Sequence, residues 1–234
     1  MVCLTAFASA GLIPNGDFSS GFSNWSTTGD TDTDTSFTYG GTGGGTISPT
    51  TGSHVSEIQS SRRRINSIAN FLGVSTADLR NAGGIYHNGY DGAAIQTTFF
   101  GSGEVSFDWN FWTTDAPSPP IPIFNDFAVV TLSGPGIVGT QITLLADVYD
   151  NGLATASGLG PVNGTGWQSL TLNLPSTGNY TIGFASLNEN DRFYDTYLHI
   201  DNVQVHPLPE PGTFLGASFL LGFLLLHRSR RRHR

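Results

Sequence analysis

The sequence contains no lysine and a single cysteine, Cys3. One cysteine excludes an intramolecular disulfide and a cluster of thiolate metal ligands. Charged residues make up only 12% of the chain, and five of the ten arginines fall within the last seven positions. Between Gly11 and Pro209, five arginines accompany seventeen acidic residues, a net charge of −12 with histidine neutral. So acidic a chain repels nucleic-acid phosphates, and nucleic acid is therefore not an expected partner.

Glycine and phenylalanine are abundant, with thirty and sixteen residues among the 234. This composition is typical of a turn-rich β protein, since helices draw on Ala, Glu, Lys and Leu. The length suits one sizeable core once the two ends are set aside. We therefore expect a mainly β fold with one β-sandwich domain over residues 11–206.

Hydrophobic spacing locates the expected elements. Val105, Phe107, Trp109 and Phe111 alternate with polar residues, and a period of two predicts a strand with one apolar face. Further strands are expected at residues 127–132, 142–148, 170–174 and 180–184. Within residues 55–81 apolar residues recur at helical spacing, which predicts a short helical insertion with helices over 55–71 and 76–81.

The N-terminus is typical of a secretion leader. Residues 4–10 read LTAFASA, and Ala8 and Ala10 are small side chains of the kind that signal peptidase accepts before cutting. We therefore predict a signal-peptide remnant over residues 1–10, with cleavage before Gly11. A disordered N-terminal tail is the alternative.

The C-terminus combines three features. Pro209, Glu210 and Pro211 are followed by the apolar run GTFLGASFLLGFLLL and then by HRSRRRHR. The prolines prevent a helix and hold Glu210 in the extended form that a protease requires. The apolar run is predicted to form a hydrophobic helix that spans about 22 Å, less than a bilayer core of about 30 Å. The arginines are expected to act as a membrane stop on the cytoplasmic side; they are Arg228, Arg230, Arg231 and Arg232.

This order of features resembles the PEP-CTERM sorting signal of Gram-negative bacteria, which the membrane protease exosortase recognises. The resemblance covers residues 207–234 and implies cleavage near Glu210. It also implies export through signal peptidase, a transient stay in the inner membrane, and delivery to the cell surface or to an extracellular exopolysaccharide matrix, as in a biofilm. A plain single-pass transmembrane tail anchor is the alternative.

Two further segments resemble known domains. NGDFSSGFSNW at residues 15–25 and YLHIDNVQV at residues 197–205 are similar to the first and last strands of galactose-binding-like jelly rolls, which include many carbohydrate-binding modules. This resemblance implies a jelly-roll β-sandwich whose terminal strands are adjacent. Ser19 and Ser20 stand where that family often has an acidic residue, which weakens the transfer of its calcium site. SFDWNF and NDFA also resemble a domain type seen in PEP-CTERM proteins.

Oxygen ligands at expected strand ends favour a calcium site. Asp91, Asp115, Asn125 and Asp126 supply carboxylate and amide oxygens, of which Ca²⁺ takes six to eight. The alternative is that these side chains only cap turns with their own backbone. No cofactor other than Ca²⁺ is expected.

Carbohydrate binding would use exposed aromatic rings that stack on sugar faces. Trp112, Tyr86, Tyr90 and Tyr149 are the candidates, because they interrupt the apolar alternation or fall in expected loops. Aromatic residues of a sandwich are more often structural, which is the alternative.

Enzymatic motifs are missing from the sequence. The histidines have no metal-ligand spacing, and no Gly-x-Ser-x-Gly motif places a nucleophile. We therefore expect a non-catalytic surface or matrix protein that binds carbohydrate or calcium. An envelope-associated hydrolase acting on polysaccharide is the alternative.

Overall fold

The computed structural model describes residues 12–39, 45–82, 89–113, 125–148, 162–190 and 194–207. The first strands are short: β1 (Ser26–Thr28), β2 (Asp30–Asp34), β3 (Phe37–Thr38), β4 (Thr46–Ile47), β5 (Val55–Gln59) and β6 (Arg63–Arg64). Helices α1 (Ile65–Leu72) and α2 (Thr76–Arg80) follow. The remaining strands are β7 (Gly89–Thr113), β8 (Phe127–Ser133), β9 (Thr140–Asp147), β10 (Val162–Gly164), β11 (Gln168–Glu189) and β12 (Thr196–His206).

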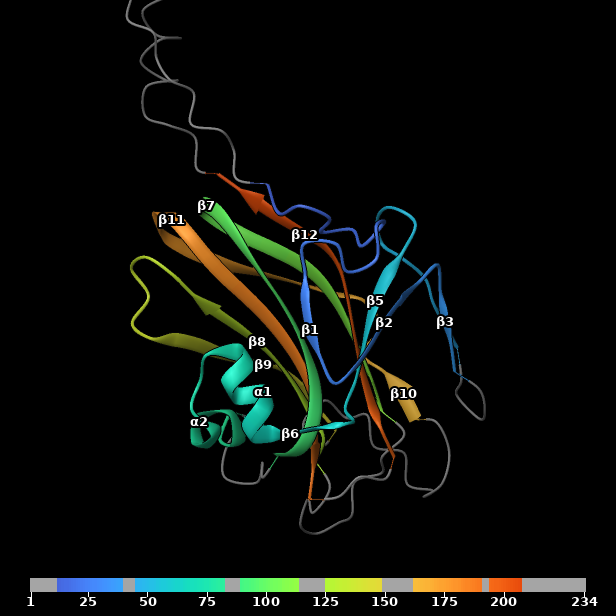
Figure 1. Cartoon of the computed structure of the whole chain (residues 1–234). Helices are drawn as coiled ribbons and strands as arrows, with labels where there is room; N and C mark the ends of the chain where they lie inside the picture. Colours follow the sequence, from blue (N-terminus) through green and yellow to red (C-terminus); the bar gives the residue numbers. More distant parts are fainter. Residues whose placement is uncertain are drawn as a thin grey trace, which may run out of the picture.

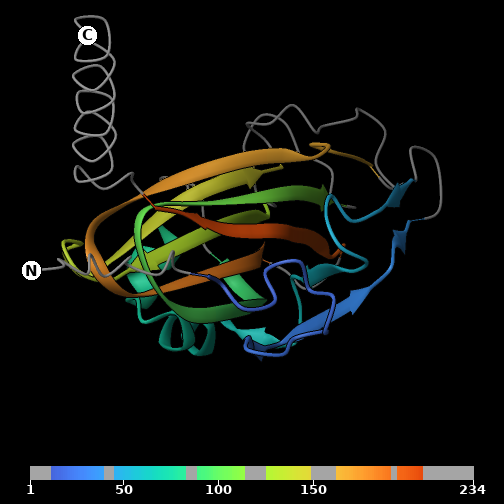
Figure 2. The same cartoon turned by 90° about the horizontal axis from the view of Figure 1, so that it is seen from above.

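The two longest strands, β7 and β11, form a ribbon that bends in the middle. They pair antiparallel along most of their length, and the register shifts between Leu174 and Gly178, next to Gly101 and Gly103 of β7. A Cβ atom at Gly101 would lie only 3.1 Å from the ring of Phe99, so the packed bend leaves little room for a side chain there. Figures 1 and 2 show both strands curving together at this point. The ribbon thereby contributes to two layers.

Each half of the ribbon pairs with a different set of strands. The half that starts at Gly89 pairs with β1, β6 and β11, and β11 continues to β8 and β9; we call this layer 1. The half that ends at Thr113 pairs with β10, β11 and β12, and β12 continues to β5 and β2; we call this layer 2. Hydrogen bonds join all of these strands in one sheet, so the sandwich is a single sheet folded over itself.

The main core fills the space between the layers. Its aromatic side chains come from both halves of the ribbon and from the N-terminal segment, and they include Phe18, Trp25, Phe107, Phe111 and Phe184. The rings of Phe107 and Phe184 meet edge to face with centroids 4.8 Å apart. Burial of these large apolar side chains is the main contribution that holds the two layers together.

A smaller core lies under the helices, which cover the outer side of layer 1 (Figure 1). Ile65, Ile68 and Leu72 of α1 and Leu79 of α2 form one cluster with Phe127 and Ala185 of the sheet. Gly73 ends α1 in the left-handed conformation at φ 67°, which glycine adopts without strain. The outer side of layer 2 carries no helix in the part of the chain that the structure describes.

The structure confirms a mainly β, sandwich-like fold, and the predicted alternation at Val105–Phe111 lies within β7. The specific jelly-roll class stays a prediction. The two strands expected at 170–174 and 180–184 belong to one strand, β11. Of the two predicted helices, the one at 76–81 is confirmed as α2, with Ser75 accepting a hydrogen bond from the Asp78 backbone N–H at 2.9 Å.

The helix predicted over 55–71 is wrong in its first half, where β5 lies between β2 and β12. Ser56 and Ile58 both point toward the core, and the hydroxyl of Ser56 donates to the Ile200 carbonyl at 2.8 Å. Because a polar serine occupies an inward position, the alternation of apolar and polar residues that predicts a strand is not visible here. Of the predicted range, residues 65–71 are helical, and α1 continues to Leu72.

The strand expected within residues 15–25 is also wrong. This segment is a series of turns with Asn15, Phe18 and Asn24 at positive φ, although Phe18 and Trp25 are buried in the core. The Val203 backbone N–H donates to the Gly16 carbonyl at 2.9 Å, so these turns lie beside β12. Because β12 pairs with β5 and β7, the terminal strands are not adjacent in the sheet.

The predicted C-terminal helix, the motif at Pro209–Pro211 and the arginines lie outside the described residues, as does the leader at 1–10. Among the residues that are described, no helix is long and apolar enough to cross a membrane.

Candidate functional site

The strand register gathers polar and aromatic side chains on the outer side of layer 2. Residues directly opposite each other in antiparallel strands point to the same side. One row across the sheet is therefore Asp32, Glu57, His199 and Asn110. A second row is Asp30, Gln59, Tyr197 and Trp112, and a third pairs Asp201 with Asp108. The residues between these rows, Ile58, Leu198 and Phe111, face the core.

A segment of the chain crosses this outer face. We call residues 37–39 and 45–51 the strap; it contains β3 and β4, which pair with each other. The ring of Tyr39 stacks on Trp112 with centroids 5.1 Å apart and lies 4.8 Å from the ring of Tyr197. Near the other end of the strap, the indole N–H of Trp167 donates to the Ser48 carbonyl at 3.2 Å. The strap thus covers the middle of the rows.

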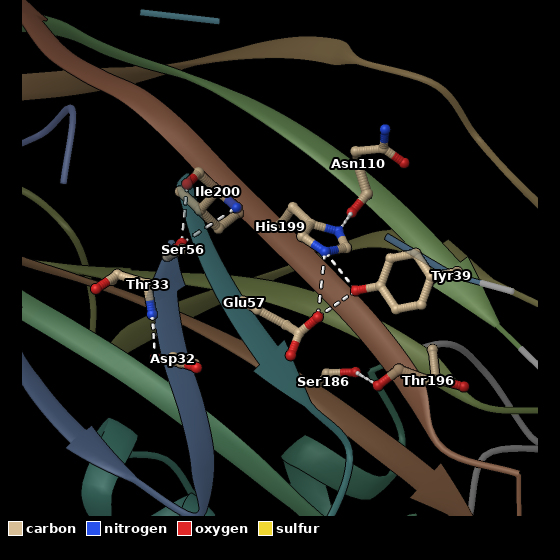
Figure 3. Close-up of polar contacts among 10 residues, drawn as sticks. All are labelled: Asp32, Thr33, Tyr39, Ser56, Glu57, Asn110, Ser186, Thr196, His199 and Ile200. Atoms are coloured by element: carbon tan, nitrogen blue, oxygen red, sulfur yellow. Dashed lines mark hydrogen bonds and ion pairs between the residues drawn. The ribbon is translucent and has the colours of Figure 1, made fainter. Parts of the chain in front are cut away.

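Tyr39 of the strap forms a compact polar cluster with Glu57 and His199 of the sheet (Figure 3). The Tyr39 hydroxyl donates a short hydrogen bond to Glu57, and its oxygen lies 2.7 Å from His199 Nε2. His199 Nε2 is 3.6 Å from the Glu57 carboxylate, and Nδ1 is 3.4 Å from the Asn110 carbonyl oxygen. His199 is fully buried. The imidazole is therefore held on both nitrogens.

Burial and the neighbouring carboxylate keep the phenols of this face protonated. Burial, followed by the charge of Glu57 and its hydrogen bond, raises the pKa of Tyr39 far above the ordinary value. Burial, followed by the charges of Asp195, Glu57 and Asp30, raises the pKa of Tyr197 to about 12. Tyr39 therefore stays a hydrogen-bond donor throughout the physiological pH range.

Asp201 fastens the far end of the strap to β12. Its buried carboxylate accepts hydrogen bonds from the backbone N–H groups of Thr50 and Thr51 at 2.5 and 2.9 Å. The Thr50 hydroxyl donates to Asp201 at 3.0 Å and lies 2.8 Å from the carboxylate of Asp108. Burial raises the pKa of Asp201, and the hydrogen bonds from Thr51, Asn202 and Thr50 oppose that shift.

The calcium candidates lie elsewhere, at the end of the sandwich away from the bend. Asp126 accepts from the Glu189 backbone N–H at 2.8 Å, and the carboxylate of Glu189 accepts from the Asn125 backbone N–H at 2.8 Å. Asp91 accepts from the Asn188 amide at 3.3 Å. Asp115 lies outside the described residues. Within the described ranges no three His, Cys, Asp or Glu side chains are placed to share a metal ion, and calcium binding stays a prediction.

The carbohydrate candidates do not form one surface. Trp112 is 8% exposed, so its expected exposure is wrong: Tyr39 stacks on its ring, and Gly164 approaches so closely that a Cβ there would lie 2.2 Å from Trp112 Nε1. Tyr90 is 45% exposed but belongs to the layer 1 half of β7. Tyr86 and Tyr149 lie outside the described residues. Whether any of the four binds sugar stays a prediction.

Sequence reasoning missed the cluster and its neighbour Tyr197. A signal was present, since Tyr197, His199 and Asp201 alternate with the core residues Leu198 and Ile200 in YLHID. The contribution of Tyr39 had no such signal, because its contacts with Glu57 and His199 span 18 and 160 residues.

Comparison with known proteins finds no match to a family model and no match among curated proteins. Two solved structures are similar in fold. One is TmCBM61 in complex with β-1,4-galactotriose, with a TM-score of 0.43, 10% identity, and coverage of 84% of this chain and 97% of that one. The other comes from a study of carbohydrate-binding modules of the β-sandwich superfamily, with a TM-score of 0.34, 12% identity, and coverage of 80% and 59%.

Proposed function

We propose that this chain is a non-catalytic carbohydrate-binding module that recognises a neutral polysaccharide on the outer face of layer 2. The observation that carries the proposal is the gathering of Tyr39, Trp112 and Tyr197 beside carboxylate and amide side chains in rows across one face. Aromatic rings stack on the apolar faces of sugars, and carboxylates and amides accept and donate hydrogen bonds to sugar hydroxyls.

The accessible part of this face selects for uncharged ligands. Tyr197 and Gln59 are partly exposed, and Asp32 and Asp34 on the edge strand β2 are exposed. Arg62 pairs with Asp30 at 2.7 Å, which leaves the remaining carboxylates of this edge in excess. An acidic face repels anionic polysaccharides at moderate salt. A neutral polysaccharide is therefore the ligand class that fits.

Affinity electrophoresis tests the proposal. The protein is expected to be retarded by at least one member of a panel of neutral polysaccharides and not by anionic ones. Tyr197→Ala is expected to weaken the retardation about tenfold in dissociation constant, because it removes the exposed part of the aromatic surface. The variant is first shown to be folded by its melting temperature.

Tyr90→Ala is the matched control, since it removes an exposed tyrosine from layer 1. Binding that disappears with Tyr90→Ala and survives Tyr197→Ala would place the site elsewhere and overturn the assignment. Release of reducing ends from the retained polysaccharide would show that the protein is a polysaccharide hydrolase and would overturn the proposal that it is non-catalytic.

We also propose that the chain is exported and processed at both ends, by signal peptidase before Gly11 and by exosortase near Glu210. The support is the order of Pro209–Glu210–Pro211, an apolar run and an arginine tail in the sequence. Mass spectrometry of the protein recovered from the surface or medium of its host is expected to show a chain without the terminal arginines. Recovery of the intact tail would contradict the proposal.

A further inference from the structure

The Tyr39, Glu57 and His199 cluster is one proton short when the imidazole is neutral. A neutral imidazole carries a proton on one nitrogen only. If Nδ1 is protonated, it donates to the Asn110 carbonyl at 3.4 Å. His199 Nε2 and the Glu57 carboxylate, 3.6 Å apart, then compete for the single hydroxyl proton of Tyr39. One of the two acceptors is left unsatisfied in a buried site.

The other tautomer of the neutral imidazole also leaves one polar contact without a proton. With Nε2 protonated, the ring donates toward Glu57 and Tyr39, and the lone pair of Nδ1 then faces the carbonyl oxygen of Asn110. An imidazolium removes both conflicts. It donates to Asn110 through Nδ1 and to the Tyr39 and Glu57 oxygens through Nε2, while Tyr39 donates to Glu57.

We propose that protonation of His199 fastens Tyr39, and with it the strap, onto the outer face of layer 2, and that loss of this proton loosens the strap. Tyr39 makes the hydrogen bonds that join the strap to Glu57 and His199, and its ring also stacks on Trp112. The fastening energy at this point therefore depends on the charge of one imidazole.

His199 is surrounded by residues of the strap and of strands β2, β5, β7 and β12. The strap contributes Tyr39 and the ring of Phe37, which lies 5.6 Å from the imidazole. β5 contributes Glu57, with Asp32 of β2 in register beside it. β12 contributes Tyr197, and β7 contributes Asn110 and Trp112, which do not titrate. The titratable groups among these, Tyr39, Glu57, Asp32 and Tyr197, are neutral or negative, so an imidazolium at His199 faces no second cation among them.

The sign of the pH dependence follows from the proton count. The fastened state binds one proton more than the loosened state, so raising the pH shifts the equilibrium toward the loosened state. The strap is therefore held more firmly at acidic than at alkaline pH.

Loosening the strap uncovers aromatic surface. Tyr39 stacks on Trp112 and packs against Tyr197, so its departure uncovers the part of each ring that it contacts. Under the proposed function, on which this one consequence rests, polysaccharide affinity is then higher at pH 8 than at pH 5.5. Fastening of the strap by a proton does not depend on any ligand.

Hydrogen exchange of the backbone amides tests the inference on the full chain. At pH 5.5 the amides of Tyr39, Thr50 and Thr51 are expected to be at least about tenfold better protected than at pH 8.0, after correction for the intrinsic exchange rate, because a charge-assisted hydrogen bond is lost. His199→Gln, which is neutral at every pH, is expected to abolish the difference. His206→Gln is the matched control, because His206 is an exposed histidine of the same strand.

A wild-type chain whose strap protection is the same at both pH values overturns the inference, as does a His199→Gln chain that keeps the difference. If His199→Gln fails to fold, Tyr39→Phe serves instead; it keeps the ring and removes the hydroxyl, and is expected to shrink the pH difference. A pH-dependent strap without polysaccharide binding would refute only the proposed function. Polysaccharide binding by a chain whose strap amides are equally protected at both pH values would refute only the proton-dependent fastening.

Discussion

Replacing Asp201 with alanine is expected to lower the free energy of unfolding by about 3 kcal/mol. The backbone N–H groups of Thr50 and Thr51 point at this carboxylate, and the Thr50 hydroxyl also donates to it. Alanine supplies no acceptor, so these donors lose their partner under the strap. Hydrogen bonds to a charged group contribute about 1.5 to 3 kcal/mol each, and the substitution removes several of them at once.

Urea unfolding followed by tryptophan fluorescence measures this loss. Asp34→Ala is the matched control, because Asp34 is an exposed aspartate of the same layer whose carboxylate accepts hydrogen bonds from the adjacent Thr35. Its removal is expected to cost less than about 1 kcal/mol. Equal effects of the two substitutions would show that Asp201 does not anchor the strap.

Phe184→Ala is expected to have the largest effect on stability, a loss of about 4 kcal/mol. Phe184 is fully buried between the layers, with its ring 4.8 Å from Phe107 and 6.2 Å from Trp25. Truncation leaves a cavity between two layers whose backbones are fixed by strand pairing on both sides of β11. The site therefore cannot collapse to fill the gap.

Phe100→Ala provides the comparison at constant chemistry. Phe100 is a phenylalanine of the same ribbon but is 53% exposed, and its loss is expected to cost less than about 1 kcal/mol in the same denaturant titration. A Phe184→Ala loss below about 2 kcal/mol would mean that the two layers close over the cavity and that the interlayer core is less rigid than the packing indicates.

The fold was predictable where one face of a strand reads as apolar and the other as polar. Residues 105–111 show this pattern, and β7 has it. β5 was missed because Ser56 occupies an inward position, where its hydroxyl is satisfied by Ile200. The turns of residues 15–25 were missed because Asn15 and Phe18 adopt positive φ. Nothing in the sequence predicts that conformation for a phenylalanine.

The candidate site was predictable in its residue types but not in its position. Trp112 was expected to be exposed, and it lies under Tyr39, which is 73 positions away in the sequence. Likewise, Asp91, Asn125 and Asp126 were expected at strand ends, and the structure buries them with hydrogen bonds to neighbouring strands. Burial of a polar side chain depends on which distant segment covers it, and the spacing of residues along the chain does not predict that.

By itself, the sequence determined a β-rich acidic domain without disulfides, since composition and period act locally along each strand. It also determined the two terminal segments on which the export proposal rests. Only the tertiary structure decided that the long ribbon folds into two layers, that rows of polar side chains face outward on one of them, and that Tyr39, Glu57 and His199 meet. These contacts join strands far apart in the chain, and their energies arise only when packing removes the same groups from water.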